Sequence, residues 1–270
     1  MANTQQLEKI GEGREAEMFA WGDGKILRLL RYPDGARSNE FQAAAMAAAA
    51  ASGVRVPAVI GAETVNGRPG LIMERISGRD LLTELGTRPW QLLRAGRTIG
   101  HAHAMLHEVR APDRLFPLRE VMRHRIRAAA QLPENLKEFS LAALDALPDG
   151  DRLCHGDFHP GNLLMDGDQP VIIDWSNVTR GHPDGDVART LLMNRLGSLP
   201  PGTPVLLRIG AKFARGVLSA IYLRSYRQRR QLDIGAIRKW EIPVAAARLA
   251  DGIPEEVSTL LALLAKTARS

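Results

Sequence analysis

The sequence predicts an α+β chain of two lobes, with a small β-rich N-terminal lobe over residues 1–76 and a larger, mainly helical C-terminal lobe over residues 77–270. Two observations predict this division. Before Gly78, short apolar runs alternate with turns that contain Gly and Asn. After it, long stretches carry apolar residues at helical spacing and are broken by Pro and Gly. We expect a ligand site in the cleft between the lobes.

The N-terminal lobe is expected to contain strand, strand, strand, helix, strand, strand. The runs MFAW and KILRLLR flank the turn at Gly22–Gly24, and VPAVIGAETV and PGLIMERI flank Asn66–Gly67, a dipeptide typical of tight hairpins. Between these hairpins, an alanine-rich helix is expected from an N-cap at Ser38 to about Ser52, with Gly53 as its terminator.

The C-terminal lobe is expected to be helical, with three short strands next to loops. The expected helices cover residues 89–108, 114–131, 134–147, 186–198, 204–229 and 254–268. The expected strands are DRLCHGD, GNLLMD and PVIIDW.

The composition is that of a soluble globular protein, with 270 residues, 45% hydrophobic and 24% charged. The net charge of 36 − 30 = +6 permits an anionic partner without indicating one. The longest apolar run, Ala43–Ala51, is too short to span a bilayer, and the N-terminus lacks the apolar segment of a secretory signal. A single cysteine, Cys154, excludes an intramolecular disulfide and suits a reducing compartment. We therefore expect a cytoplasmic protein.

The densest group of polar residues is LCHGDFHPGNLLM, Leu153–Met165, which is followed by VIIDW. Four residues separate Asp157 from Asn162, and Asp174 ends an apolar strand. Carboxylate and amide oxygens are ligands for hard cations such as Mg²⁺, so Asn162 and Asp174 are candidate metal ligands. Asp157 is then free to accept or orient the proton of an attacking hydroxyl, a division of labour that phosphoryl transfer needs. The alternative, that these residues only cap turns in a buried loop, explains so specific a combination poorly.

The run HGDFHPGNLL…VIIDW closely resembles the catalytic loop and metal-binding segment of the aminoglycoside phosphotransferase/choline kinase family. The resemblance covers almost the whole chain. It implies a bilobal protein-kinase-like fold, ATP or GTP as phosphoryl donor, Mg²⁺, and a small-molecule hydroxyl as acceptor. By motif matching, Asp157 is the catalytic base, and Asn162 and Asp174 are the metal ligands. His155 matches the histidine that braces the loop, and Asp186 in GDVAR matches the aspartate that bonds its backbone.

The resemblance also implies a phosphate-binding region in the N-terminal lobe. Gly11 and Gly13 match a loop whose glycines let backbone N–H groups approach phosphates. Where the family has a lysine on the third strand, this chain has Arg28, which is expected to contact phosphate and to pair with Glu40. Lys25 is the fallback, but it falls on the opposite face of the strand.

The segment LIMERISG matches the crossover between the lobes. Backbone groups around Glu74 to Ile76 are expected to bind the adenine, with Met73 as the bulky residue behind it.

Two other patterns favour structural explanations. His101, His103 and His107 suggest a metal cluster, but only the last two share a helix face, which favours a helix packed under the catalytic loop with one satisfied histidine. The segment YLRSYRQRR, Tyr222–Arg230, mixes aromatic and basic residues as RNA-binding segments do, but a solvated helix face is favoured. No nucleic-acid or membrane partner is expected, and the chain is expected to be a monomer or a homodimer.

The acceptor stays open. Residues 181–270 contain 14 Lys+Arg against 7 Asp+Glu, a balance of 14 − 7 = +7, which weakens the case for a polycationic aminoglycoside. Two classes of acceptor remain candidates: an antibiotic of aminoglycoside, macrolide or cyclic basic peptide type, and a metabolite such as choline, homoserine or a sugar. A catalytically weak kinase-like protein that only binds nucleotide is the second hypothesis.

Overall fold

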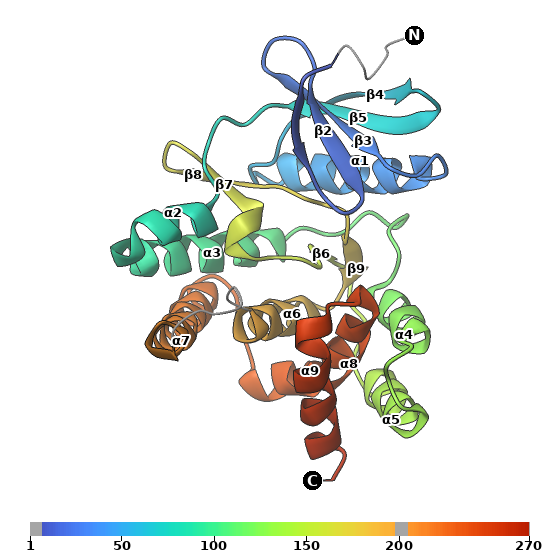
Figure 1. Cartoon of the computed structure of the whole chain (residues 1–270), viewed down its shortest axis with the longest axis vertical. Coiled ribbons are helices and arrows are strands. Elements are labelled where there is room, and N and C mark those ends of the chain that lie inside the picture. The colour runs from blue at the N-terminus through green and yellow to red at the C-terminus, as the bar shows by residue number, and fades with distance from the viewer. Residues whose placement is uncertain (1–6, 198–204, 270) are drawn as a thin grey trace.

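The computed structural model describes residues 7–197 and 205–269, and Figure 1 shows a sheet with one helix above a larger group of helices. The sheet is antiparallel, with strand order β1-β2-β3-β5-β4. Its strands are β1 (Lys9–Glu12), β2 (Ala16–Ala20), β3 (Lys25–Leu30), β4 (Val59–Val65) and β5 (Arg68–Glu74). The predicted order of strands and helix is confirmed, and so is the division into a β-rich and a helical part.

The two predicted hairpin turns are present because their residues adopt left-handed backbone angles. Asn66 and Gly67 have φ of 52° and 74°, the pair of positive angles that a tight hairpin needs. Gly22 and Gly24 have φ of 68° and 67°. These turns hold β3 in the middle of the sheet, where Leu27 and Leu29 are fully buried.

Helix α1 (Ala36–Ala51) packs against β4 and β5. The predicted N-cap at Ser38 is wrong, because the helix begins at Ala36 after Gly35. The Ser38 hydroxyl instead accepts a hydrogen bond from Gln42 Nε2, one turn further along (3.1 Å).

The C-terminal part contains eight α-helices in the described residues, two more than expected. They are α2 (Leu81–Thr87), α3 (Leu92–Leu106), α4 (Leu118–Ala128), α5 (Glu134–Asp145), α6 (Pro183–Leu196), α7 (Val205–Arg227), α8 (Ile234–Arg248) and α9 (Pro254–Thr267). The expected end of the helix over residues 186–198 and the expected start of the helix over residues 204–229 lie outside the described residues. Short strands form two antiparallel pairs: β6 (Arg152–Cys154) pairs with β9 (Thr179–Gly181), and β7 (Leu163–Asp166) forms a hairpin with β8 (Gln169–Ile172).

The sequence patterns did not predict α8, because Gly235 and Pro243, two residues typical of helix ends and turns, lie within it. Pro243 removes one helical hydrogen bond, which costs stability in an isolated helix. Here Trp240 and Val244 are buried, and α8 packs against α4, α5, α6 and α9. Burial of this apolar face outweighs the cost of the hydrogen bond that Pro243 removes.

Among the described residues, no helix combines the length and apolar character needed to cross a membrane.

Candidate active site

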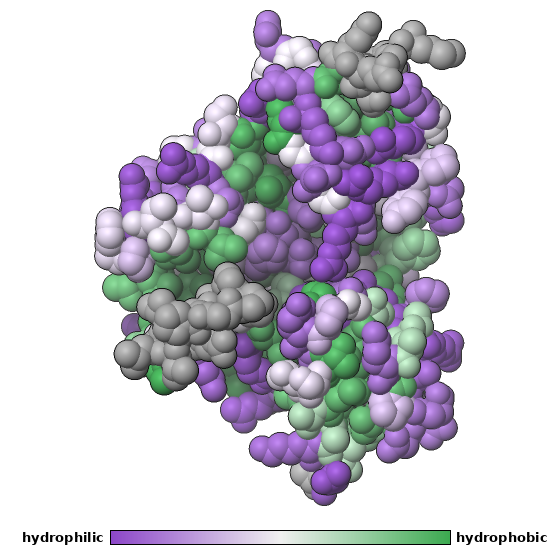
Figure 2. Space-filling model, in the orientation of Figure 1, coloured by the Kyte–Doolittle hydropathy of each residue, from purple (hydrophilic) through white to green (hydrophobic). Residues whose placement is uncertain are grey.

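A cleft of about 1160 Å³ lies between the sheet and the helices. Figure 2 shows hydrophilic side chains meeting in the hollow between the upper and lower parts of the molecule. The cleft is lined by the β1–β2 loop, β3, the segment after β5, the loop after β6 and the segment after β8. Its opposite side is lined by residues of helices α4, α6, α7 and α8 and by the start of α9.

The loop after β6 (residues 155–162, hereafter the catalytic loop) begins with a turn that only glycine fits. Gly156 has φ of +77°, and a Cβ there would lie 2.3 Å from the backbone oxygen of Asn177. This turn directs the chain so that Asp157, the next residue, lines the cleft.

Asp157, Asn162 and Asp174 come together in this cleft. Asn162 Nδ2 donates to the backbone oxygen of Asp157 (2.8 Å) and to its Oδ2 (3.2 Å). The backbone N–H of Ile173 donates to Asn162 O (3.0 Å), which joins the catalytic loop to the segment that carries Asp174. Asp174 has φ of 58°, a conformation that non-glycine residues rarely adopt and that clusters at functional sites.

The donor set suits a hard divalent cation. Asn162 uses its amide nitrogen on Asp157, so its amide oxygen is left to act as a ligand. Asp174 is exposed to the cleft, and its Oδ1 accepts a hydrogen bond from the Ser176 hydroxyl. One amide oxygen and one carboxylate are the protein ligands that Mg²⁺ commonly takes beside substrate phosphates.

Asp157 is held in its ionised form. Burial alone would raise the pKa of its carboxyl, but His159 Nε2 lies 3.6 Å from Oδ2, and Arg189 and His155 lie close. Together these groups lower the pKa of Asp157 to about 2. The Nδ1 atom of His159 accepts from Gly161 N (3.1 Å), so the other ring nitrogen carries the proton and faces Asp157.

His155 and Asp186 support the catalytic loop. His155 Nε2 donates to Ile173 O (3.0 Å), and its Nδ1 accepts from Asp157 N (3.3 Å). The Asp186 carboxylate, at the start of α6, accepts from His155 N (2.6 Å) and Gly156 N (3.0 Å). Both residues therefore lie where the resemblance places them, with contacts to backbone rather than to the cleft.

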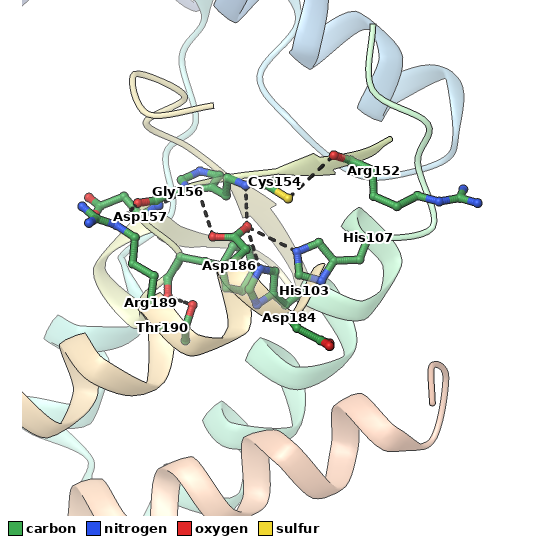
Figure 3. A network of polar contacts seen from close by, with 12 residues as sticks. His103, His107, Arg152, Cys154, Gly156, Asp157, Asp184, Asp186, Arg189 and Thr190 are labelled. Carbon is green, nitrogen blue, oxygen red and sulfur yellow. Dashed lines mark hydrogen bonds and ion pairs between the residues drawn. The ribbon is translucent and has the colours of Figure 1, made fainter. Parts of the chain in front are cut away.

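Asp186 also binds two buried histidines of α3, as Figure 3 shows. His103 Nε2 and His107 Nε2 lie 3.1 and 3.3 Å from Asp186 Oδ2. Their Nδ1 atoms lie 2.8 and 2.7 Å from the hydroxyls of Tyr222 and Tyr226 on α7. This pattern makes each Nε2–H a donor to the carboxylate and each tyrosine a donor to Nδ1.

These contacts decide two questions that the sequence raised. His103, His107 and Asp186 form the one group of metal-ligand type within the described residues, but every ring nitrogen already has a hydrogen-bond partner, so both histidines are satisfied. Tyr222 and Tyr226 are buried, so they offer no stacking surface to RNA. The expected solvated face is correct for Arg224 and for residues 227–229, which are exposed, whereas Arg230 is half-buried.

The buried histidines predict a fall in stability below about pH 6.5. Burial lowers the pKa of His103 and His155 from 6.5 and that of His107 to about 3. Below pH 6.5 the unfolded chain binds protons that the folded chain does not. Each histidine's contribution is therefore complete above pH 6.5 and is lost as pH falls toward the folded-state pKa, by about 1 kcal/mol between pH 7.5 and 5.5.

Urea unfolding at the two pH values measures this loss. The exposed His124 is the control, and His124→Gln is expected to leave the pH dependence unchanged. Equal stability of the wild-type chain at pH 7.5 and 5.5 would contradict the burial of neutral imidazoles.

In the N-terminal lobe, Gly11 and Gly13 lie in the β1–β2 region and line the cleft, as does the buried Arg28 of β3. Arg28 Nη2 lies 3.9 Å from Glu15 Oε2, and Arg28 Nη1 has no hydrogen-bond partner in the described residues. Burial lowers the pKa of Arg28, and the nearby charges of Asp174 and Glu15 oppose that shift. A buried guanidinium with an unmet donor is suited to phosphate oxygens.

The expected pairing of Arg28 with Glu40 is not formed. Glu40 is exposed and does not line the cleft, because the buried face of α1 carries the residue before it, Asn39, and then Gln42 and Met46. The carboxylate beside Arg28 comes from Glu15 of the β1–β2 loop, a residue that the sequence analysis did not single out.

This geometry predicts different effects for two variants. Arg28→Ala is expected to raise the nucleotide KM by roughly 10- to 100-fold through loss of a charged hydrogen-bond donor, with little change in acceptor KM. Glu40→Gln is the control and is expected to behave as wild type. Steady-state kinetics with varied nucleotide measures both. A similar rise in Glu40→Gln would show that Glu40 takes part in nucleotide binding.

The end of β5 and the segment after it also border the cleft, with Met73 and Glu74 of β5 and then Ile76 among the lining residues. The Glu74 side chain is turned to Arg55, whose hydrogen bond lowers the pKa of Glu74 to about 2. Glu74 N and Arg75 N donate to Ala58 O and Gly24 O, both at 2.9 Å. Ile76 N has no backbone partner in the described residues, so it is available as a donor to a ligand in the cleft.

The lobes and this cleft together define a kinase-like phosphotransferase. The chain belongs to the phosphotransferase enzyme family, whose model matches residues 6–230. It is therefore an enzyme that transfers a phosphoryl group to a hydroxyl group.

Solved structures of antibiotic kinases share the fold. An amicoumacin kinase in complex with AMP-PNP, Ca²⁺ and Ami has a TM-score of 0.67 and 15% identity, over 97% of this chain and 87% of that one. A thermostable mutant of the aminoglycoside phosphotransferase APH(4)-Ia has a TM-score of 0.65 and 16% identity, over 98% of this chain and 94% of that one. A macrolide 2'-phosphotransferase from Brachybacterium faecium has a TM-score of 0.56 and 20% identity, over 96% and 91%. No curated protein sequence matches the chain.

Proposed function

We propose that the protein transfers the γ-phosphoryl group of ATP or GTP to a hydroxyl of a small molecule, with Mg²⁺ as the metal. The observation that carries this proposal is the meeting of Asp157, Asn162 and Asp174 in one cleft with the β1–β2 loop and Arg28. The three solved structures named above are of antibiotic kinases, which supports an antibiotic as the acceptor. A metabolite of choline, homoserine or sugar type is the alternative.

Each part of the cleft then has a role. Ile76 N and the neighbouring backbone bind the base against Met73, with the lobe boundary at residue 76. The β1–β2 backbone and Arg28 hold the phosphates. Asn162 and Asp174 hold the cation, which supplies charge neutralisation on the phosphate oxygens when bound.

Asp157 orients the acceptor hydroxyl toward the phosphorus. A carboxylate with a pKa of about 2 is too weak a base to remove a hydroxyl proton before the reaction starts. It accepts the proton late, as the new O–P bond forms and the acidity of the hydroxyl rises. This timing fits a loose transition state in which bond cleavage to the leaving group leads.

The experiment is a nucleotide-consumption assay with ATP and GTP over a panel of hydroxylated antibiotics and metabolites, with each product identified by mass. The expected product is heavier than its acceptor by one phosphoryl group. Tight nucleotide binding without turnover of any compound would favour the catalytically weak alternative. Absence of nucleotide binding would overturn the proposal.

A further inference from the structure

Three arginines from three helices lie beside Asp157 on the wall of the cleft that faces away from the sheet. Arg125 of α4, Arg189 of α6 and Arg248 of α8 (hereafter the arginine wall) all line the cleft. Figure 3 shows the Arg189 side chain next to Asp157. None of the three is among the candidate site residues that the sequence indicates.

Two carboxylates stand against these three guanidinium groups. Asp251 accepts from all of them, with Arg248 Nη1 at 2.9 Å, Arg189 Nη2 at 3.4 Å, and a short contact to Arg125 Nη2. Glu256 forms a bidentate pair with Arg248, at 2.8 and 3.0 Å. The arginine wall with its two carboxylates thus has a formal charge of 3 − 2 = +1, and the next acidic groups of the cleft are Asp157 and Glu15.

Holding these three arginines close together is electrostatically unfavourable. Burial and then the charges of Arg125 and Arg248 lower the pKa of Arg189 to about 10. Burial and then Arg248 lower the pKa of Arg125. Three guanidinium groups therefore concentrate like charge in a largely buried site, where water screens it little.

The unused donors lie on two of the arginines. Arg248 has all three nitrogens bound to Asp251 and Glu256. Arg189 uses Nε on Gly156 O and Nη2 on Asp251, and Arg125 uses Nε on Ala247 O and Nη2 on Asp251. In both, Nη1 has no hydrogen-bond partner within the described residues. Asp157 interacts electrostatically with both side chains, which places them near the catalytic carboxylate.

We propose that the acceptor carries an anionic group, a carboxylate or a phosphate ester, which Arg125 and Arg189 bind while Asp157 orients the hydroxyl. Guanidinium groups bind these anions strongly through charge-assisted hydrogen bonds. A cationic group in the same place would face the two Nη1 donors that have no partner among the described residues, which costs affinity. The inference rests on the proposed function and names the substrate class of that site.

Sugar derivatives that differ in one charged group test this inference. The full chain, with AMP-PNP and Mg²⁺ bound so that the nucleotide site is filled, is titrated calorimetrically with D-glucuronate, glucose 6-phosphate, glucose and glucosamine. At least one anionic sugar is expected to bind more tightly than glucose, and glucosamine more weakly. Glucuronate and glucose 6-phosphate distinguish a carboxylate from a phosphate as the bound group.

Arg125→Gln is expected to weaken binding of the anionic sugar by roughly 10- to 100-fold. Arg127→Gln is the control, because Arg127 lies on the same helix, is exposed and does not line the cleft. Should Arg125→Gln not fold, Arg125→Lys keeps the charge without the guanidinium, and a smaller loss of about threefold is expected.

The inference is overturned if no anionic sugar binds more tightly than glucose, or if Arg125→Gln binds the anion as wild type does. It is also overturned if the acceptor found in the nucleotide-consumption assay lacks an anionic group. A repeat of the titration without nucleotide separates the two proposals: Arg125-dependent anion binding in a chain that binds no nucleotide would contradict the proposed function alone.

Discussion

Replacing Asp157 by asparagine is expected to lower kcat by about 10²- to 10⁴-fold, the usual contribution of a positioned acid–base group. Asparagine keeps the size of the side chain and its place beside Asn162 and His159. It removes the charge that orients the hydroxyl and the site that accepts its proton. Single-turnover kinetics measures the loss, and nucleotide affinity is expected to stay within about threefold because Asp157 does not bind the base or phosphates.

Asp168→Asn is the matched control, since Asp168 is an exposed carboxylate in the β7–β8 turn and does not line the cleft. It is expected to retain wild-type kcat. Full activity in Asp157→Asn would remove Asp157 from the chemistry. The pH–rate profile of the wild-type enzyme gives a second check, because a pKa of about 2 keeps Asp157 ionised above pH 4 and adds no acidic limb between pH 5 and 8.

The residues of this reaction centre could be found from sequence because they are local. Asp157 and Asn162 belong to one short loop, and Asp174 follows the next hairpin, so their spacing along the chain nearly determines their spacing in space. Much of the antiparallel sheet was predictable for a similar reason, since two of its three hairpins, β2–β3 and β4–β5, have turn signals at Gly22–Gly24 and Asn66–Gly67.

The pairing of Arg28 could not be found in that way. A helix turns by about 100° per residue, so an error of one position moves a side chain from the buried to the exposed face. Asn39 is buried and Glu40 is exposed, and nothing in the alanine-rich sequence of α1 fixes that rotation. The family pattern pointed to Glu40, but the carboxylate beside Arg28 is Glu15.

Sequence patterns also could not predict contacts between helices that lie far apart along the chain. His103 and Tyr222 are 119 residues apart, and they meet because α3 and α7 pack closely. A Cβ at Gly100 would lie 2.5 Å from Tyr222 O, so glycine permits this approach. The arginine wall likewise combines α4, α6 and α8, and α8 was not predicted.

Asp186→Asn is expected to destabilise the fold by about 2–5 kcal/mol, because each buried N–H donor left without an acceptor costs about 1–3 kcal/mol. Burial alone would raise the pKa of Asp186, but hydrogen bonds from His103 and His107 hold it well below its ordinary value. The carboxylate thus accepts four N–H groups, two from these histidines and two from the backbone of His155 and Gly156. An asparagine offers one acceptor oxygen, and its NH₂ group would face donors that have no other acceptor in the described residues.

Asp184→Asn is the control that separates the loss of the Asp186 hydrogen bonds from the loss of any carboxylate at the start of α6. Asp184 lies on the first turn of the same helix and contacts His182 rather than the catalytic loop, so its variant is expected to lose about 1 kcal/mol or less. Urea unfolding compares the two variants. At temperatures where Asp186→Asn remains folded, kcat is expected to fall while nucleotide affinity is kept, because Asp186 anchors the backbone just before Asp157. Equal stability and equal kcat in the two variants would show that the loop holds its geometry through His155 and Arg189 without this carboxylate.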